Sequence, residues 1–159
     1  VLIFCNARHI VDTVFRSLRK DFKDIDYMHA GLGQDTRSSI IRKFRSQKLR
    51  YLIASDVAAR GLDFSHVSHV INWDFPRDGE QYTHRTGRTG RMGKKGKAFT
   101  FVSKRDLPLF RKLLSSKKIT PCWIGKDPLC ENDAPPERKT QRRKRPFRPH
   151  STQGRKKTE

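Results

Sequence analysis

Three arginines stand at intervals of three residues, Arg85, Arg88 and Arg91, and a glycine comes directly before each of the last two. On a helix, steps of three would spread these side chains over roughly a third of the circumference. A planar guanidinium can contact two phosphate oxygens at once, so the group has the chemistry of a clamp for a polyanion. A solvated basic face is the alternative, but such a face needs no glycine, which costs about 1 kcal/mol in a helix interior. We therefore expect a helix over 80–91 whose glycines let backbone or ligand approach this face closely.

The apolar residues locate the elements that must carry these side chains. Short apolar runs predict buried parallel strands, and apolar residues three or four apart predict helices between them. We expect strands at 1–5, 25–29, 50–54, 67–73 and 98–102, a helix after each of the first two strands, the arginine helix at 80–91 and a last helix at 106–114. This alternation predicts an α/β fold in three layers, with a parallel sheet flanked by helices on both faces.

Further polar residues follow the predicted strands, at the carboxyl edge of the sheet where α/β proteins gather ligand groups. Ser55 and Asp63 bracket a turn-rich segment after the third strand, and they either contact a ligand or cap a short helical turn. Arg37 lies at the start of the helix after the second strand, beside exposed N–H groups that suit a phosphate. Asn6 follows the first strand. The sequence thus predicts a ligand-binding edge that the arginine helix adjoins.

Five segments resemble the motifs of DEAD-box RNA helicases. His84–Arg91 resembles H-R-x-G-R-x-G-R, Ser55–Asp63 resembles S/T-D-V-A-A-R-G-x-D, His29–Arg37 resembles H-x-x-x-x-Q-x-x-R, Phe4–Arg8 resembles F-x-N-S/T-R/K, and Val70–Pro76 resembles V-I-N-Y/F-D-x-P. Their order and spacing match the family from residue 1 to about residue 115. The resemblance implies the second RecA-like domain of the helicase core.

The resemblance also implies roles for single residues. Arg88 and Arg91 would be catalytic, as arginine fingers that reach the γ-phosphate of ATP held on a partner domain. ATP contacts are implied for Gly61, which permits a turn, for Asp63, whose carboxylate would hold the ribose hydroxyls, and for the two fingers. Contacts with the other domain are implied for His84, Arg85, Arg60 and Asp56, and contacts with RNA for Asn6, Gly31, Gln34, Arg37 and Ser55.

The sequence departs from the family pattern at two of the RNA-facing segments. Ala7 lacks the hydroxyl that is frequent at its position, and Ala30 stands where many members have glycine. We interpret His29 as the end of a strand, and Val70–Pro76 as a strand end with structural polar contacts.

Charge is spread over the whole chain, whose net charge is +20. We place the helicase C-terminal RecA-like domain at 1–118, with 25 Lys and Arg against 11 Asp and Glu, and a disordered basic tail at 119–159, with 11 against 5. Both parts are therefore basic, which points to a polyanionic partner. The tail either captures RNA without sequence preference or only keeps the protein in solution.

The cysteines, the hydropathy and the first residues of the sequence limit which classes of protein remain possible. Three cysteines without paired spacing predict neither a disulfide framework nor a zinc site, and we expect a reducing compartment. No apolar run approaches the roughly 18 residues that span a bilayer. Because the sequence opens at Val1 inside a strand-like run, we expect a fragment of a longer protein. We expect a cytoplasmic monomer, with a nuclear or nucleolar location as the alternative through the run Arg142–Arg145.

The resemblance implies an ATP-dependent RNA helicase of which this chain is the C-terminal half. The sequence contains neither G-x-x-x-x-G-K-S/T nor D-E-A-D, so ATP and Mg²⁺ are expected to be bound mainly by the N-terminal RecA-like domain of the same protein. Single-stranded RNA or a short duplex would bind through its backbone, with little sequence preference. The alternatives are a non-catalytic RNA-binding or scaffold module that retains the fold, and a motor that acts on DNA.

Overall fold

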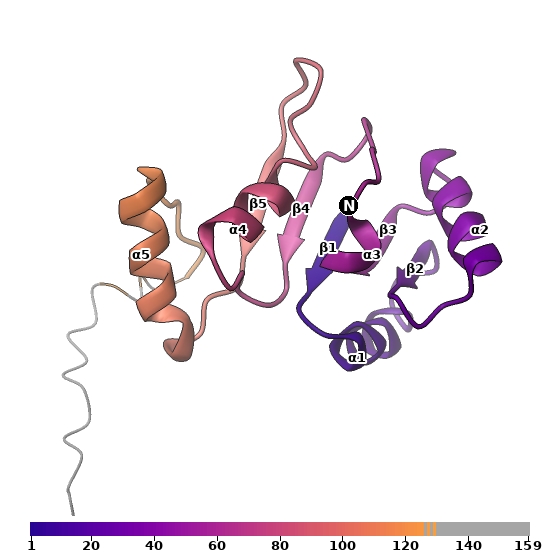
Figure 1. The fold of residues 1–159 in the computed structure, drawn as a ribbon, viewed down its shortest axis with the longest axis horizontal. Helices are drawn as coiled ribbons and strands as arrows, with labels where there is room; N and C mark the ends of the chain where they lie inside the picture. Colours follow the sequence, from indigo (N-terminus) through magenta and orange to yellow (C-terminus); the bar gives the residue numbers. More distant parts are fainter. Residues whose placement is uncertain (126, 128, 130–159) are drawn as a thin grey trace, which may run out of the picture. The chain divides into compact units, whose positions relative to one another are not determined.

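A computed structural model describes residues 1–125, 127 and 129, which form a parallel sheet surrounded by helices (Figure 1). Along the chain the elements are β1 (Leu2–Cys5), α1 (Arg8–Leu18), β2 (Ile25–Met28), α2 (Gln34–Arg45), β3 (Tyr51–Ser55), α3 (Asp56–Ala59), β4 (His69–Asn72), α4 (Gly79–Thr86), β5 (Lys97–Thr100), the 3-10 turn η1 (Lys104–Asp106) and α5 (Leu107–Lys117). The disorder predicted for the tail falls, from residue 130 onward, outside the described residues.

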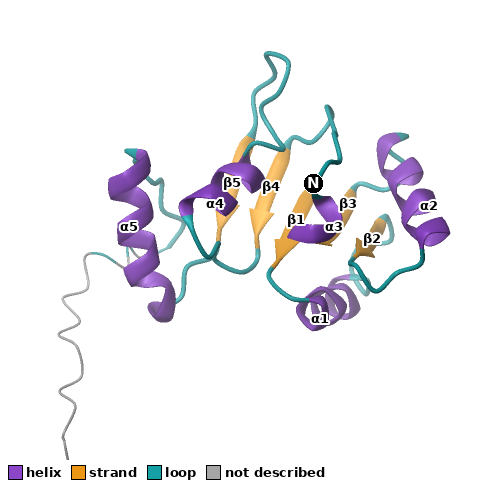
Figure 2. Ribbon diagram, viewed as in Figure 1, coloured by secondary structure: helices purple, strands orange, loops and turns teal. Residues whose placement is uncertain are grey.

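The sheet has the strand order β2-β3-β1-β4-β5, and every pair of neighbours is parallel. All arrowheads in Figure 2 therefore point the same way, and the carboxyl ends of the strands meet at one edge. In register, Cys5 of β1 lies opposite Ser55 of β3, and Phe4 lies opposite Asn72 of β4. Each of the five predicted strands is present, and the α/β fold is confirmed.

The alternating side chains of the strands divide the core into two clusters, because successive residues of a strand point to opposite faces. On one face Leu2, Phe4, Leu52, Ala54 and Val70 pack with Ile40 and Phe44 of α2 and with Ala58 and Ala59 of α3. On the other face Ile3, Cys5 and Ile53 pack with Val11 and Val14 of α1. The sheet is thus covered by helices on both sides, which makes three layers.

A third apolar cluster surrounds α5. Phe110 and Leu113 of this helix pack with Phe75, which follows β4, and the Trp123 ring lies 5.3 Å from that of Phe110, centroid to centroid. Leu129 is also packed against this cluster. Packed residues therefore continue beyond residue 118, where the sequence suggests the end of the domain. Within the described ranges, no helix is long and apolar enough to cross a membrane.

Candidate functional site at the carboxyl edge of the sheet

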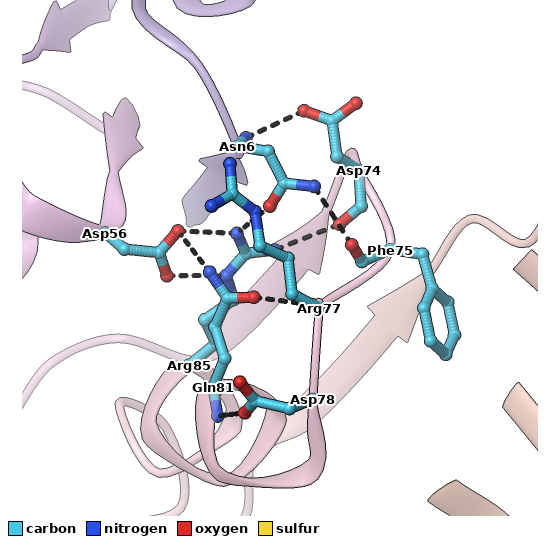
Figure 3. A network of polar contacts seen from close by, with 8 residues as sticks. All are labelled: Asn6, Asp56, Asp74, Phe75, Arg77, Asp78, Gln81 and Arg85. Atoms are coloured by element: carbon cyan, nitrogen blue, oxygen red, sulfur yellow. Dashed lines mark hydrogen bonds and ion pairs between the residues drawn. The ribbon is translucent and has the colours of Figure 1, made fainter. Parts of the chain in front are cut away.

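A buried arginine lies at the centre of a polar network where β1, β3 and β4 end (Figure 3). Arg85 of α4 is 1% exposed and donates from Nε and Nη2 to the two carboxylate oxygens of Asp56, over 2.7 and 2.6 Å. Its Nη2 also donates to Oδ1 of Asn6 over 2.6 Å, and its Nη1 to the backbone carbonyl of Asp74 over 2.9 Å. The guanidinium lies 5.3 Å from the centre of the Phe4 ring. A charge at this depth is tolerated because it is paired and its donors are satisfied.

The same network fixes the loops that follow β1 and β4. The backbone N–H of Asn6 donates to the Asp74 carboxylate over 2.8 Å, and its side-chain amide donates to the carbonyl of Phe75 over 3.0 Å. Asn72 donates from its amide to the hydroxyl of Thr100 over 2.9 Å. The interpretation of Val70–Pro76 as a strand end with structural polar contacts is confirmed.

Two residues that the sequence analysis does not single out complete the network. Gln81 of α4 donates from its side chain to Asp56 over 2.8 Å and accepts from the backbone N–H of Arg77 over 2.6 Å. Asp78 caps the start of α4 by accepting from the backbone N–H of Gln81 over 2.7 Å. The spacing Asp78-x-x-Gln81 is typical of a helix start, so the sequence contained this signal.

The neighbouring thiol of Cys5 is kept neutral. Burial is the main cause that raises the pKa of this thiol to about 12, and the nearby carboxylates of Asp74 and Asp56 act in the same direction, while Arg85 opposes them. Since only the thiolate is a strong nucleophile, Cys5 is a core residue, as its apolar surroundings predict.

The expectation of one arginine helix over 80–91 is wrong. Helix α4 ends at Thr86, and the N–H groups of Arg88 and Thr89 bond to carbonyls three residues back, over 3.1 Å each, in turns rather than an α-helix. Gly90 has a φ of +67°, which a helix does not contain. A Cβ at Gly87 would lie 2.9 Å from the carbonyl oxygen of Thr83, so the close backbone approach expected of a glycine here is present.

The three arginines therefore do not share one polyanion-binding face. Arg85 points into the domain, whereas Arg88 and Arg91 leave the turns beyond α4. The regular spacing in the sequence did not reveal this difference, because helix α4 ends between Arg85 and Arg88. That Arg85 and Asp56 also contact another domain stays a prediction.

Arg88 and Arg91 converge on the segment that follows α3. Arg91 forms an ion pair with the carboxylate of Asp63 and donates from Nε to the carbonyl of Gly87 over 2.7 Å, while Arg88 donates to the carbonyl of Leu62. Burial lowers the pKa of Arg88, and the positive charge of Arg91 lowers it further. Gly61, with a φ of +76°, forms the turn just before them. The structure thus brings together all the residues for which ATP contacts are expected.

A cavity of about 570 Å³ lies beside this group. The residues that line it include the four expected to face another domain, namely Asp56, Arg60, His84 and Arg85, together with Arg88. The lining also includes the acidic Asp78 and Glu80, so the open hollow is polar and carries charges of both signs. Among residues 1–125, 127 and 129, no cluster of three or more His, Cys, Asp or Glu side chains could hold a metal ion.

The residues for which RNA contacts are expected lie along β2, β3 and β1 at the same edge. Gly31 is exposed in the turn after β2, and Gln34 is exposed at the start of α2, whose first N–H groups face away from the helix body. Arg37, one turn later, has a buried Nε for which no hydrogen-bond partner occurs in the described part of the chain. Ser55 ends β3, and its hydroxyl makes no cap bond to α3. Asn6 has its amide engaged inside the network, so an RNA contact through it stays a prediction.

Comparison with known proteins shows what this domain is similar to. The model of the helicase conserved C-terminal domain matches residues 1–93. The ATP-dependent RNA helicase eIF4A of Candida albicans is 44% identical over 112 residues, which are 70% of this chain and 28% of that protein. The ATP-dependent RNA helicase CshA of Listeria monocytogenes is 46% identical over 110 residues, which are 69% of this chain and 21% of that protein.

Comparison with solved structures indicates the same family as these sequence relatives. The structure of the C-terminal domain of the DEAD-box protein Dbp5 matches with a TM-score of 0.68 and 31% identity, over 75% of this chain and 71% of that one. The chain thus spans most of an isolated C-terminal domain, but less than a third of either sequence relative.

Proposed function

The chain belongs to the DEAD-box helicases as a helicase C-terminal domain, and we propose that it is one half of an ATP-dependent RNA helicase. In this proposal the domain binds the RNA backbone along the carboxyl edge of its sheet and supplies two arginine fingers to ATP. The other RecA-like domain of the protein holds most of the nucleotide and its Mg²⁺. The observation that carries the proposal is the convergence of Arg88, Arg91 and Asp63 beside the polar cavity.

The nucleotide side of the proposal depends on an exchange of partners. In this structure the guanidinium of Arg91 and the carboxylate of Asp63 neutralise each other, and Asp63 is 71% exposed. An exposed ion pair contributes only about 0–1 kcal/mol, so ATP can replace it at little cost. The freed carboxylate would accept from ribose hydroxyls, and the freed guanidinium would contact phosphate oxygens in pairs. Such a finger contributes about 10³–10⁵ to the rate of phosphoryl transfer.

On the RNA side, the first turn of α2 and the end of β3 supply donors without reading bases. Helix N-terminal N–H groups and the guanidinium of Arg37 are suited to phosphate, as is the hydroxyl of Ser55. Contacts of this kind hold a strand by its backbone, so little sequence preference is expected. A strand held in a geometry that a duplex cannot adopt would be released from its partner.

The buried network around Arg85 connects the two sides mechanically. It joins Asn6 and Asp56, which follow the RNA-side strands β1 and β3, to α4, from whose end the fingers leave. Because Arg85 is buried and each of its donor nitrogens is paired, this network can hold both groups in a fixed relation.

The test is strand separation by the protein extended toward its amino terminus. A short labelled RNA duplex should separate when ATP is added, Arg88→Ala should abolish separation, and Arg111→Ala, an exposed change on α5, should not. RNA binding without ATP-dependent separation in the unaltered protein would favour the alternative of a binding or scaffold module.

A further inference from the structure

The turn after β2 is attached to the domain by a histidine whose two ring nitrogens are both engaged. His29 follows β2 directly, and its Nδ1 accepts from the backbone N–H of Gly31 over 3.0 Å. Its Nε2 lies 3.3 Å from a carboxylate oxygen of Asp12 on α1. The His29 side chain is 12% exposed. The ring therefore lies between α1 and the turn that leads into α2.

The partners determine where the proton of the ring is. An ionised carboxylate only accepts and a backbone N–H only donates, so the neutral ring must carry its proton on Nε2 and a lone pair on Nδ1. With this tautomer both contacts are satisfied at once. With the other tautomer Nδ1–H would face the Gly31 N–H, and both would be donors.

Packing around the ring leaves the turn little freedom. A Cβ at Gly31 would lie 3.0 Å from both Nδ1 and Cε1 of His29, so a larger residue at this position would require the ring to shift by a few tenths of an ångström. The Tyr27 ring lies 5.5 Å from that of His29, and the N–H of Leu32 donates to the His29 carbonyl over 3.2 Å. Besides Asp12, the guanidinium of Arg8 faces this turn, 3.7 Å from the same Cβ position.

We propose that His29 is a positioning residue for RNA: it fixes the Gly31 turn, and thereby the start of α2, so that Gln34 and Arg37 meet the phosphates. This inference rests on the proposed function and names a residue that need not touch RNA itself. The Gly31 N–H already donates to His29. Gly31 would therefore favour phosphate binding because its small size leaves room for the phosphate, and not by donating a hydrogen bond to it.

Three substitutions of His29 test whether its ring acts as a hydrogen-bond acceptor for the Gly31 N–H or only fills space. His29→Asn places an amide oxygen where it can accept from the N–H two residues on, as in an Asx turn. His29→Gln extends toward Asp12 without such an acceptor near Gly31, and His29→Leu fills the space without polar atoms. Affinity for a short fluorescein-labelled oligouridylate should fall about fivefold in the Leu and Gln variants, as for the loss of one hydrogen bond, and should be nearly retained in the Asn variant.

Two further measurements on the same chain make the outcome decisive. Two-bond ¹H–¹⁵N correlation spectra of the unaltered chain should show His29 protonated at Nε2; protonation at Nδ1 overturns the inference whatever the variants do. Thermal unfolding of each variant identifies any variant that fails to fold. The ring spectrum is recorded on the unaltered chain, so it remains informative even if a variant does not fold.

Arg37→Ala distinguishes failure of this inference from failure of the proposed function. If Arg37→Ala weakens RNA binding but His29→Leu does not, His29 is not a positioning residue and the proposed RNA site stands. If neither substitution weakens binding, RNA does not use this turn, and both proposals fail at this site.

Discussion

Replacement of the buried guanidinium by an apolar chain, Arg85→Met, should strongly destabilise the domain. The substitution removes four hydrogen bonds, to Asp56, Asn6 and the Asp74 carbonyl, and leaves the Asp56 carboxylate without its cation. Removing one partner of a buried pair costs about 3–5 kcal/mol, because the other charge stays behind unpaired. Asp56 is 31% exposed, so water can reach its carboxylate, and we expect about 3 kcal/mol, the lower end of that range.

Urea unfolding of the chain, followed by circular dichroism, measures this decrease in stability. With an m value of about 2 kcal/mol/M, the unfolding midpoint should fall by about 1.5 M. Arg111→Met, an exposed change on α5, is the matched control and should shift the free energy of unfolding by no more than about 0.5 kcal/mol. Adding Asp56→Leu to Arg85→Met should restore part of the stability, since the unpaired carboxylate is then gone. A change in Arg85→Met as small as that of the control would refute the view that this pair organises the site.

Four further predictions concern separate parts of the chain. Arg91→Ala in the amino-terminally extended protein should lower ATP turnover by about 10³-fold or more while RNA affinity stays near its original value, and a large decrease in RNA affinity would contradict the finger role. Mass-spectrometric mapping of brief alkylation at pH 8 should find the exposed Cys122 modified well before Cys5, since burial raises the pKa of the Cys5 thiol to about 12; equal rates would contradict this. Burial lowers the pKa of His66, so the folded state resists its protonation, and the free energy of unfolding should decrease as the pH falls below about 6.5. His66→Phe should flatten that dependence, and an unchanged pH profile would assign it to other groups. Deletion of residues 135–159 should reduce the slope of log affinity for RNA against log salt by about 0.7 for each phosphate that the tail neutralises, and an unchanged slope would show that the tail does not bind RNA.

The strands and the edge at which they end were predictable because a parallel strand buried on both faces is a continuous apolar run. Val1–Cys5 and Tyr51–Ala54 have that composition, and polar residues follow each directly. Where β1 and β3 are neighbours, Asn6 and Asp56 had to come close. Local sequence was sufficient for the strands and the polar residues that follow them, whereas the adjacency of β1 and β3 comes from the strand order of the structure.

The different fates of the three arginines were not predictable, since residues of the same type at the same spacing have the same local signal. Arg85 is buried because its partners Asp56 and Asn6 arrive from 29 and 79 residues away along the chain. The position of His29 likewise depends on Asp12, 17 residues before it on another element. Contacts between residues so far apart in the sequence form only once the sheet is assembled.

We propose that this domain completes an ATP-hydrolysing site whose other half lies on the second RecA-like domain of the protein. The most direct test measures phosphate release from ATP by the amino-terminally extended protein and by this chain, each with and without single-stranded RNA. Release is expected only from the extended protein, and it should be strongly stimulated by RNA. Release by this chain alone, or none by the extended protein while it still binds RNA, would contradict the claim.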